Sequence, residues 1–230
     1  MIDITRINRA TLETQPYSWA SIGELFPQRN AVRLAKSYPR DHFKTVSGFG
    51  GEKDYLYESR SLIGMGSDTI SYPECLSRTW IELARDLLSP EYRIAMSLLT
   101  ARDLTLLPME TNVLHYGPGG LQGPHPDLPD KVVTHVLYFN RWWDQADGGC
   151  LHILGSSDPS DIAAEIEPVV GNSAVLVRSP NSWHAVSRVR EGCNRSRRSV
   201  TVTFYRHGSI STMWPPGDAA PLHYYDGFGA

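Results

Sequence analysis

The chain of 230 residues has 41% hydrophobic and 20% charged residues, a composition typical of a globular protein rather than a disordered one. Its net charge of −3 and pI of about 6.2 argue against nucleic-acid and membrane-surface partners, which need a basic field. The sequence shows no spanning apolar run and no signal-peptide pattern, so we expect a cytoplasmic protein with a single domain over residues 1–230.

Helical signals dominate the first 103 residues, which we predict to be a helical cover region. One apolar stripe at helical spacing lies in residues 1–40: Trp19, Ile22, Leu25 and Phe26. Residues 55–62 have the aromatic and aliphatic content of a strand. A clear amphipathic helix follows Pro73 and ends at Ser89, and Pro90 begins a second helix that runs to about Leu99.

From Leu104 the hydrophobic period changes to two, and short strand-like runs alternate with turns. The predicted strands are residues 104–107, 111–116, 131–140, 150–154, 173–178, 185–189 and 199–205. Many short strands of this kind predict a mainly β fold with flanking helices, in which the N-terminal helices pack on one sheet. The β core is assigned to residues 104–206. The tail, residues 207–230, contains Trp214 and is expected to pack on the body.

His125 and Asp127 form an H-x-D pair in the stretch 114–127. Side chains two residues apart on extended backbone point to the same face, so both can reach one ion. One further histidine would complete the ligand set typical of non-haem Fe(II) oxygenases. The downstream candidates are His135, His152, His184, His207 and His223. Strand positions favour a hydrogen-bonded structural role for the first two. His184 is the best placed, because a strand antiparallel to residues 173–178 returns it to the His125 region.

Four residues share one face of the last predicted strand: Arg197, Ser199, Thr201 and Thr203. Arg197 would then lie beside hydroxyl groups and point where His184 points. A fork-shaped guanidinium in that position suits a dicarboxylate. Arg195 and Arg198 would be ordinary solvated charges, although spacing alone leaves Arg198 as an alternative to Arg197.

Several motifs follow one another in a fixed order along the second half of the chain. They are Tyr116-Gly117-Pro118-Gly119 before His125-Pro126-Asp127, Thr134 to Tyr138 before Gly148-Gly149, Glu167-Pro168 before Ser173, and Ser182-Trp183-His184 before Arg197-Arg198-Ser199. This ordered set resembles the double-stranded β-helix core, a jelly-roll or cupin-like barrel, of the Fe(II)- and 2-oxoglutarate-dependent dioxygenases. The similarity is greatest to their prolyl-4-hydroxylase-like branch.

The resemblance implies a role for each matching residue. The implied Fe(II) ligands are His125, Asp127 and His184, and the implied co-substrate contacts are Arg197, Ser199, Tyr116 and Tyr138. Arg197 and Ser199 fall on the family's Arg-x-Ser element, which favours Arg197 over its neighbours. Buried strand tyrosines that only make hydrogen bonds are the alternative for Tyr116 and Tyr138.

Two segments depart from the family pattern. The stretch between His184 and Arg197 is longer and richer in charge, which suggests an extended exposed hairpin. Arg178 replaces an apolar residue and is either a solvated strand end or a contact to an acidic substrate. The carboxylate at Asp127 argues against the related halogenases, in which a small residue opens that position. Candidate mobile covers are residues 48–51, 64–66 and 119–124 and the tail.

The implied activity is oxidation of an unactivated C–H bond, usually hydroxylation, with Fe(II), 2-oxoglutarate and O2 and with ascorbate as a candidate reductant. Succinate and CO2 would be the co-products. Because the sequence shows no peptide-recognition tract, we favour a small molecule such as an amino acid, a sugar or a secondary-metabolite intermediate. The alternatives are a hydroxylase of protein or peptide residues, a metal-dependent cupin isomerase or hydrolase, and a non-catalytic jelly-roll binding module.

Overall fold

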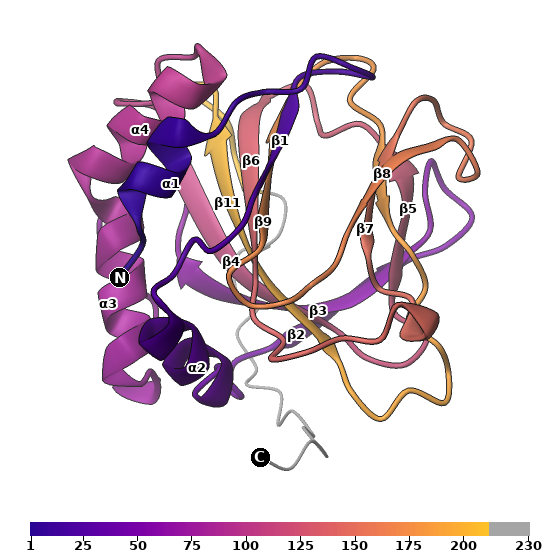
Figure 1. Cartoon of the computed structure of the whole chain (residues 1–230), viewed down its shortest axis with the longest axis horizontal. Coiled ribbons are helices and arrows are strands. Elements are labelled where there is room, and N and C mark those ends of the chain that lie inside the picture. The colour runs from indigo at the N-terminus through magenta and orange to yellow at the C-terminus, as the bar shows by residue number, and fades with distance from the viewer. Residues whose placement is uncertain (212–230) are drawn as a thin grey trace.

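A computed structural model describes residues 1–211, in which four α-helices lie against one wrapped sheet (Figure 1). The helices are α1 (Ile4–Arg9), α2 (Gln28–Lys36), α3 (Arg78–Leu88) and α4 (Pro90–Thr100). The strands are β1 (Trp19–Ile22), β2 (Lys44–Gly48), β3 (Tyr55–Ile63), β4 (Met109–Tyr116), β5 (Leu121–His125), β6 (Lys131–Tyr138), β7 (Leu151–Leu154), β8 (Ile162–Ile166), β9 (Ser173–Val177), β10 (His184–Val186) and β11 (Arg197–Tyr205). The predicted packing of the tail residue Trp214 lies outside the described residues.

Helices α3 and α4 meet at Ser89-Pro90 as the sequence indicates, although α3 begins at Arg78 rather than directly after Pro73. The Ser77 hydroxyl accepts a hydrogen bond from the Trp80 amide and caps the start of α3. Ser89 ends α3 and caps α4 by accepting from the Tyr92 amide, and Pro90 occupies the first turn, where no amide hydrogen is needed. The two helices therefore turn back on each other and present their apolar faces to the sheet.

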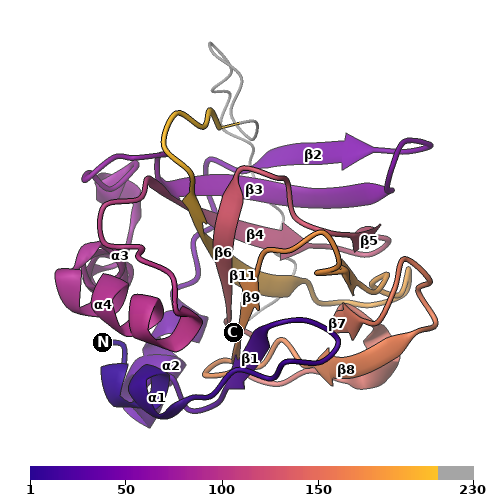
Figure 2. The ribbon, with the colours of Figure 1, turned by 90° about the horizontal axis from the view of Figure 1, so that it is seen from above.

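The strands form one continuous sheet in the order β1-β9-β6-β11-β4-β3-β5-β10-β7-β8, with β2 paired to β3. The sheet wraps so that β5, β7 and β8 face the layer that contains β4, β6, β9 and β11, and the helices cover the other side of that layer (Figure 1). The long hairpin of β2 and β3 reaches from the helical side across to β5, as seen from above in Figure 2. This is the double-stranded β-helix arrangement that the sequence predicts, with helices packed on one sheet.

Strand β11 shows how alternation divides the interior into two parts. Val200, Val202 and Phe204 point toward the helices and join the apolar cluster that contains Trp80 of α3. The alternate residues of β11 point between the two layers of the sheet, and five of them line a cavity there: Arg197, Ser199, Thr201, Thr203 and Tyr205. The helices thus stabilise the outer face of this layer, and its inner face is left free for polar side chains.

Two predictions of secondary structure are wrong. The apolar stripe at Trp19 is not helical, because residues 19–22 form β1, the edge strand, and pair with β9, Trp19 opposite Leu176. Residues 104–107 form no strand, and Leu106 of that segment is exposed. Strands β2, β5 and β8 were not predicted. In β5, the sequence Leu-Gln-Gly-Pro-His contains a glycine and a proline that hide the period-two pattern.

No helix within residues 1–211 has both the length and the apolar character that crossing a membrane requires.

Candidate metal centre and co-substrate pocket

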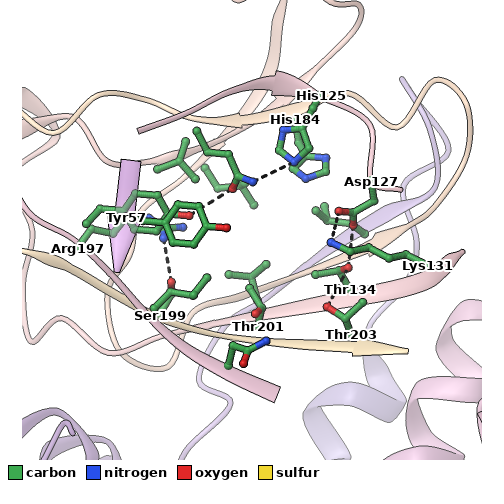
Figure 3. Close-up of a pocket in the computed structure, with 18 of the residues that line it drawn as sticks. Tyr57, His125, Asp127, Lys131, Thr134, His184, Arg197, Ser199, Thr201 and Thr203 are labelled. Atoms are coloured by element: carbon green, nitrogen blue, oxygen red, sulfur yellow. Dashed lines mark hydrogen bonds and ion pairs between the residues drawn. The ribbon is translucent and has the colours of Figure 1, made fainter. Parts of the chain in front are cut away.

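Two strands and one short connection bring together the three predicted metal ligands. His125 ends β5 and His184 begins β10, and these antiparallel strands place the two residues directly opposite each other. Asp127 follows His125 by two residues and faces the same way (Figure 3). All three side chains are buried, and one potential ligand atom from each lies within 4.8 Å of the others. The structure therefore assembles the group that the H-x-D motif and His184 predict.

Both imidazoles are held in the tautomer that a metal requires. The Nδ1–H of His125 donates to the carbonyl oxygen of Gly123 at 2.8 Å, and that of His184 donates to the carbonyl oxygen of Ser182 at 2.9 Å. The lone pair is then left on Nε2 of each ring. Burial lowers the pKa of both histidines, and the neighbouring His184 lowers that of His125 further. Both rings are therefore neutral, which is the form that binds a metal ion.

The Asp127 carboxylate is ionised and held by side chains on both oxygens. Lys131 donates to Oδ1 at 2.7 Å and Thr134 donates to Oδ2 at 2.8 Å. Burial alone would raise the pKa of Asp127, but the Lys131 ammonium holds it well below its ordinary value. Arg178 donates from Nε to the backbone carbonyl of Asp127 at 3.3 Å. Arg178, which is half-buried, thus supports the backbone that carries a candidate ligand, and its contact to an acidic substrate stays a prediction.

Arg197 lies at the other end of the same cavity, as Figure 3 shows. Its side chain is 1% exposed, donates from Nη1 to the Ser199 hydroxyl at 2.9 Å, and has no hydrogen bond at Nε. The guanidinium carbon lies 4.7 Å from the Tyr116 ring centre and 5.3 Å from that of Tyr138. Within residues 1–211 no carboxylate pairs with Arg197, so a buried cation faces the cavity without a counter-charge.

Tyr116 also connects this end of the cavity to the metal ligands. Its hydroxyl donates to Oε1 of Gln122 at 3.3 Å, and the amide nitrogen of Gln122 lies 3.3 Å from Nε2 of His125. Burial raises the pKa of Tyr116 and of Tyr138, and the Arg197 charge acts against that rise. Gln122 was missed by sequence reasoning, because its position on β5 becomes visible only when the strand is known.

The cavity encloses about 660 Å³ of space, open solvent at its mouth included. Its wall combines the residues already described with further polar and aromatic side chains, among them Tyr57, Asn112, Lys131, Thr134, Thr201, Thr203 and Tyr205. Lys131 and Thr134 were not singled out from the sequence. The parity of Thr134 with Tyr138 on one strand is the signal that could have identified it.

His135 and His152, the two strand histidines, have the hydrogen-bonded structural roles that the sequence predicts. Tyr92 of α4 lies 2.9 Å from Nδ1 of His135, which faces the helices, and His152 pairs with Glu165 at 2.7 Å.

The charged segment between His184 and Arg197 is exposed only in part: Arg188, Arg190 and Glu191 are exposed, but other residues of the segment are packed on the body. Val189 is buried, and its backbone exchanges hydrogen bonds with Gly119 and Gly120 at 2.9 and 2.8 Å. Arg195 is not merely solvated, because it pairs with Asp147 at 2.9 Å and lies over the Trp142 ring. These contacts also hold residues 119–120, the start of one predicted cover.

A second cluster in the described part of the chain has potential metal-binding groups: Asp41, His42 and Cys75. Arg60 already pairs with Asp41 at 3.1 Å, and Cys75 is exposed. Desolvation by its neighbours, followed by the charges of Asp41 and Glu74, raises the pKa of the Cys75 thiol, which disfavours the thiolate that a metal needs. The buried triad is therefore the better metal site.

A double-stranded β-helix in which two histidines and an aspartate face an unpaired arginine defines the class of non-haem iron oxygenases. The family model of the 2OG-Fe(II) oxygenase superfamily matches residues 111–206, which include the triad and Arg197. This match, together with the triad and Arg197 that lie within it, indicates a 2-oxoglutarate-dependent dioxygenase.

Solved structures with the same fold include several prolyl hydroxylases. A Pseudomonas putida prolyl-4-hydroxylase is 21% identical, with a TM-score of 0.57, over 82% of this chain and 92% of that chain. A prolyl hydroxylase from Trichoplax adhaerens, in complex with a hypoxia inducible factor oxygen degradation domain peptide fragment, is 14% identical, with a TM-score of 0.52, over 89% and 87%. The non-heme alpha ketoglutarate dependent epimerase SnoN from nogalamycin biosynthesis is 14% identical, with a TM-score of 0.50, over 96% and 92%. No curated protein matches the chain in a sequence comparison.

Proposed function

We propose that the protein uses Fe(II), 2-oxoglutarate and O2 to hydroxylate, or otherwise oxidise, an unactivated C–H bond of a small molecule. The observation that carries the proposal is that one cavity has a neutral His-His-Asp donor set at one end and a buried cation without a counter-charge at the other. The first suits a divalent iron ion and the second suits the distal carboxylate of 2-oxoglutarate.

In this proposal His125 and His184 present Nε2 to the iron, and Asp127 contributes one carboxylate oxygen. The backbone carbonyls of Gly123 and Ser182 keep both rings oriented. With 2-oxoglutarate and O2 bound, the iron supplies the oxidation, and succinate and CO2 are released. The protein contributes a fixed arrangement of ligands and a cavity that selects the carbon to be oxidised.

Arg197 and Ser199 bind the distal carboxylate of 2-oxoglutarate, and the rings of Tyr116 and Tyr138 enclose the guanidinium. A guanidinium shielded from water by two aromatic rings interacts more strongly with a carboxylate than an exposed one does.

In the first test, Fe(II) is added to the protein under anaerobic conditions, with and without 2-oxoglutarate. The weak visible charge-transfer absorption of the Fe(II)–2-oxoglutarate chelate is then measured. In air, with ascorbate as reductant, 2-oxoglutarate should then be converted to succinate. We expect His184→Ala to abolish the absorption, whereas the matched control His152→Ala, on the outer face beside Glu165, should retain it. Circular dichroism would verify that both variants are folded. A full-strength absorption in His184→Ala would show that the ligand set is wrong.

The rival cupin isomerase or hydrolase makes a different prediction. Such an enzyme would bind the metal through the same triad but would have no use for 2-oxoglutarate. Metal binding without any change on adding 2-oxoglutarate, and without succinate formation, would therefore favour that class over the proposal.

A further inference from the structure

The end of the β2–β3 hairpin brings Lys53, a lysine outside the triad, close to β5, the strand that ends in His125. The amide of Gly123 donates to the carbonyl oxygen of Asp54 at 2.7 Å, and Tyr55 pairs with Gln122, so the end of the hairpin is fixed beside β5. Lys53 directly precedes these contacts. Its charge is close enough to lower the pKa of His125, and Asp127 in turn acts on the pKa of Lys53.

The Lys53 ammonium has no fixed partner. It is half-buried, and no hydrogen bond or ion pair engages it within residues 1–211. Burial, together with the positive charge of Lys131, lowers the pKa of Lys53 to about 8. The charged form of a half-buried ammonium next to another cation is destabilised, and binding of an anion would stabilise it.

Lys131 and Tyr17 complete a group of hydrogen-bond donors around Asp127. Lys131 lines the cavity and lies at the opposite end from Arg197 (Figure 3), so it is separate from the proposed co-substrate anchor. The Tyr17 hydroxyl is buried without a hydrogen-bond partner among the described residues, and burial and the Asp127 charge raise its pKa. Of these three donors, Lys131 is part of the cavity wall, and Asp127 is the only carboxylate among the wall residues. The exposed Glu52 is the other carboxylate that acts on the pKa of Lys53.

The balance of charges around the proposed metal centre also favours an anion site near Lys53 and Lys131. In the proposed complex the iron dication offsets the 2-oxoglutarate dianion, and Asp127 offsets only one of the three cationic side chains Arg197, Lys131 and Lys53. The chain has only four lysines, so it is notable that two of them lie beside Asp127. The surplus of positive charge is then on the side of the metal away from Arg197.

We propose that Lys53 and Lys131 bind an anionic group of the substrate, a carboxylate or a phosphate, next to the metal centre. The inference rests on the proposed function and narrows its substrate class to acids such as free amino acids or phosphorylated sugars. Tyr17 donates a further hydrogen bond to the same group. The substrate carbon to be oxidised is positioned by this anchor.

The first experiment compares compounds in matched pairs for their ability to stimulate succinate release. Free amino acids are compared with their amides, and sugar phosphates with the parent sugars. At least one charged member should stimulate release while its neutral partner does not. Lys53→Gln should raise the concentration needed for half-maximal stimulation about tenfold or more, as expected for loss of a charge-assisted contact. Lys36→Gln, an exposed lysine at the end of α2, is the matched control and should behave as wild type.

The second experiment needs no substrate. Lysines of the Mn(II)·2-oxoglutarate complex are acylated with a trace of an amine-specific reagent and quantified by mass spectrometry. Acetate or inorganic phosphate should slow acylation of Lys53, whereas chloride at equal ionic strength should not, and Lys36 should be unaffected. If neither anion protects Lys53 although 2-oxoglutarate binds, or if a neutral compound stimulates turnover as well as its acid, this inference is wrong and the proposed function stands. If 2-oxoglutarate itself does not bind, the proposed function fails first.

Discussion

Replacing Arg197 by methionine should separate co-substrate binding from folding. Arg197 is 1% exposed, and within the described residues its partners are the neutral Ser199 hydroxyl and two aromatic rings. A buried cation without a counter-charge weakens the free protein, because its desolvation is not offset by an ion pair. Methionine has a similar length and no charge, so the free variant should be as stable as wild type or more stable.

The same substitution should strongly weaken the binding of 2-oxoglutarate, although it leaves the free protein as stable as wild type or more stable. Removing one partner of a buried charge pair costs about 2–5 kcal/mol of binding free energy. At about 1.4 kcal/mol for each tenfold change, the Kd should rise by about 30-fold to several thousand-fold. Stabilisation of the protein against heat by 2-oxoglutarate should disappear together with the affinity.

The assay is an anaerobic titration of the Fe(II) protein with 2-oxoglutarate, accompanied by thermal unfolding with and without the co-substrate. Arg198→Met is the matched control. The Arg198 guanidinium lies over the Tyr38 ring at 5.4 Å, toward the helices, so its removal should leave the Kd for 2-oxoglutarate within about threefold. A Kd in Arg197→Met within threefold of wild type would refute the assignment of Arg197, and a large loss in Arg198→Met instead would identify the other arginine as the anchor.

Two further predictions concern stability. Burial lowers the pKa of His135 to about 3, so in the folded protein the ring stays neutral while the unfolded chain binds a proton below about pH 6.5. The free energy of unfolding of wild type should therefore fall about 1.4 kcal/mol per pH unit more steeply between pH 6.5 and 3 than that of His135→Gln, and parallel curves in urea titrations would contradict this. Gly148 has φ +68°, and a Cβ there would lie 2.1 Å from the carbonyl oxygen of Arg188. Gly148→Ala should cost about 2–4 kcal/mol by urea unfolding, whereas Gly51→Ala, with no atom within 4 Å of the added carbon, should change stability by less than about 0.5 kcal/mol. Equal losses in the two alanine variants would show that the strain argument is wrong.

The order of motifs was enough to predict the barrel and to select His184, because strand parity and antiparallel return are local consequences of the chain. The side chains that support the ligands were harder to find. Gln122 lies in a Gly- and Pro-containing stretch that does not look like a strand, although β5 is held on both sides by β3 and β10. Lys53 reaches the centre only through a hairpin that is more than seventy residues away from Asp127 in the sequence. The proximity of Lys53 to Asp127 depends on the pairing register between β3 and β5, and neither segment alone determines that register.

Tertiary pairing also overrode local preference at Trp19. Its neighbours have helical spacing, yet the edge of β9 offers free backbone groups, and pairing with that edge decides the structure. Arg178 illustrates the same limit on a smaller scale, because its bond to the Asp127 backbone could not be inferred from a charged residue at a strand end.

Strand β3 has a consequence for how the protein can be divided. Along the backbone ladders it is the only link between the half of the sheet that carries Arg197 and the half that carries His125 and His184, within the described residues. It lies outside residues 111–206, the segment that matches the family model. A fragment that begins at residue 104 would keep every proposed iron and co-substrate contact but lose the strand that sets the distance between them. The distance between the two sites that would hold the carboxylates of a bound diacid is therefore set by a strand that supplies none of the proposed iron ligands and none of the proposed co-substrate contacts.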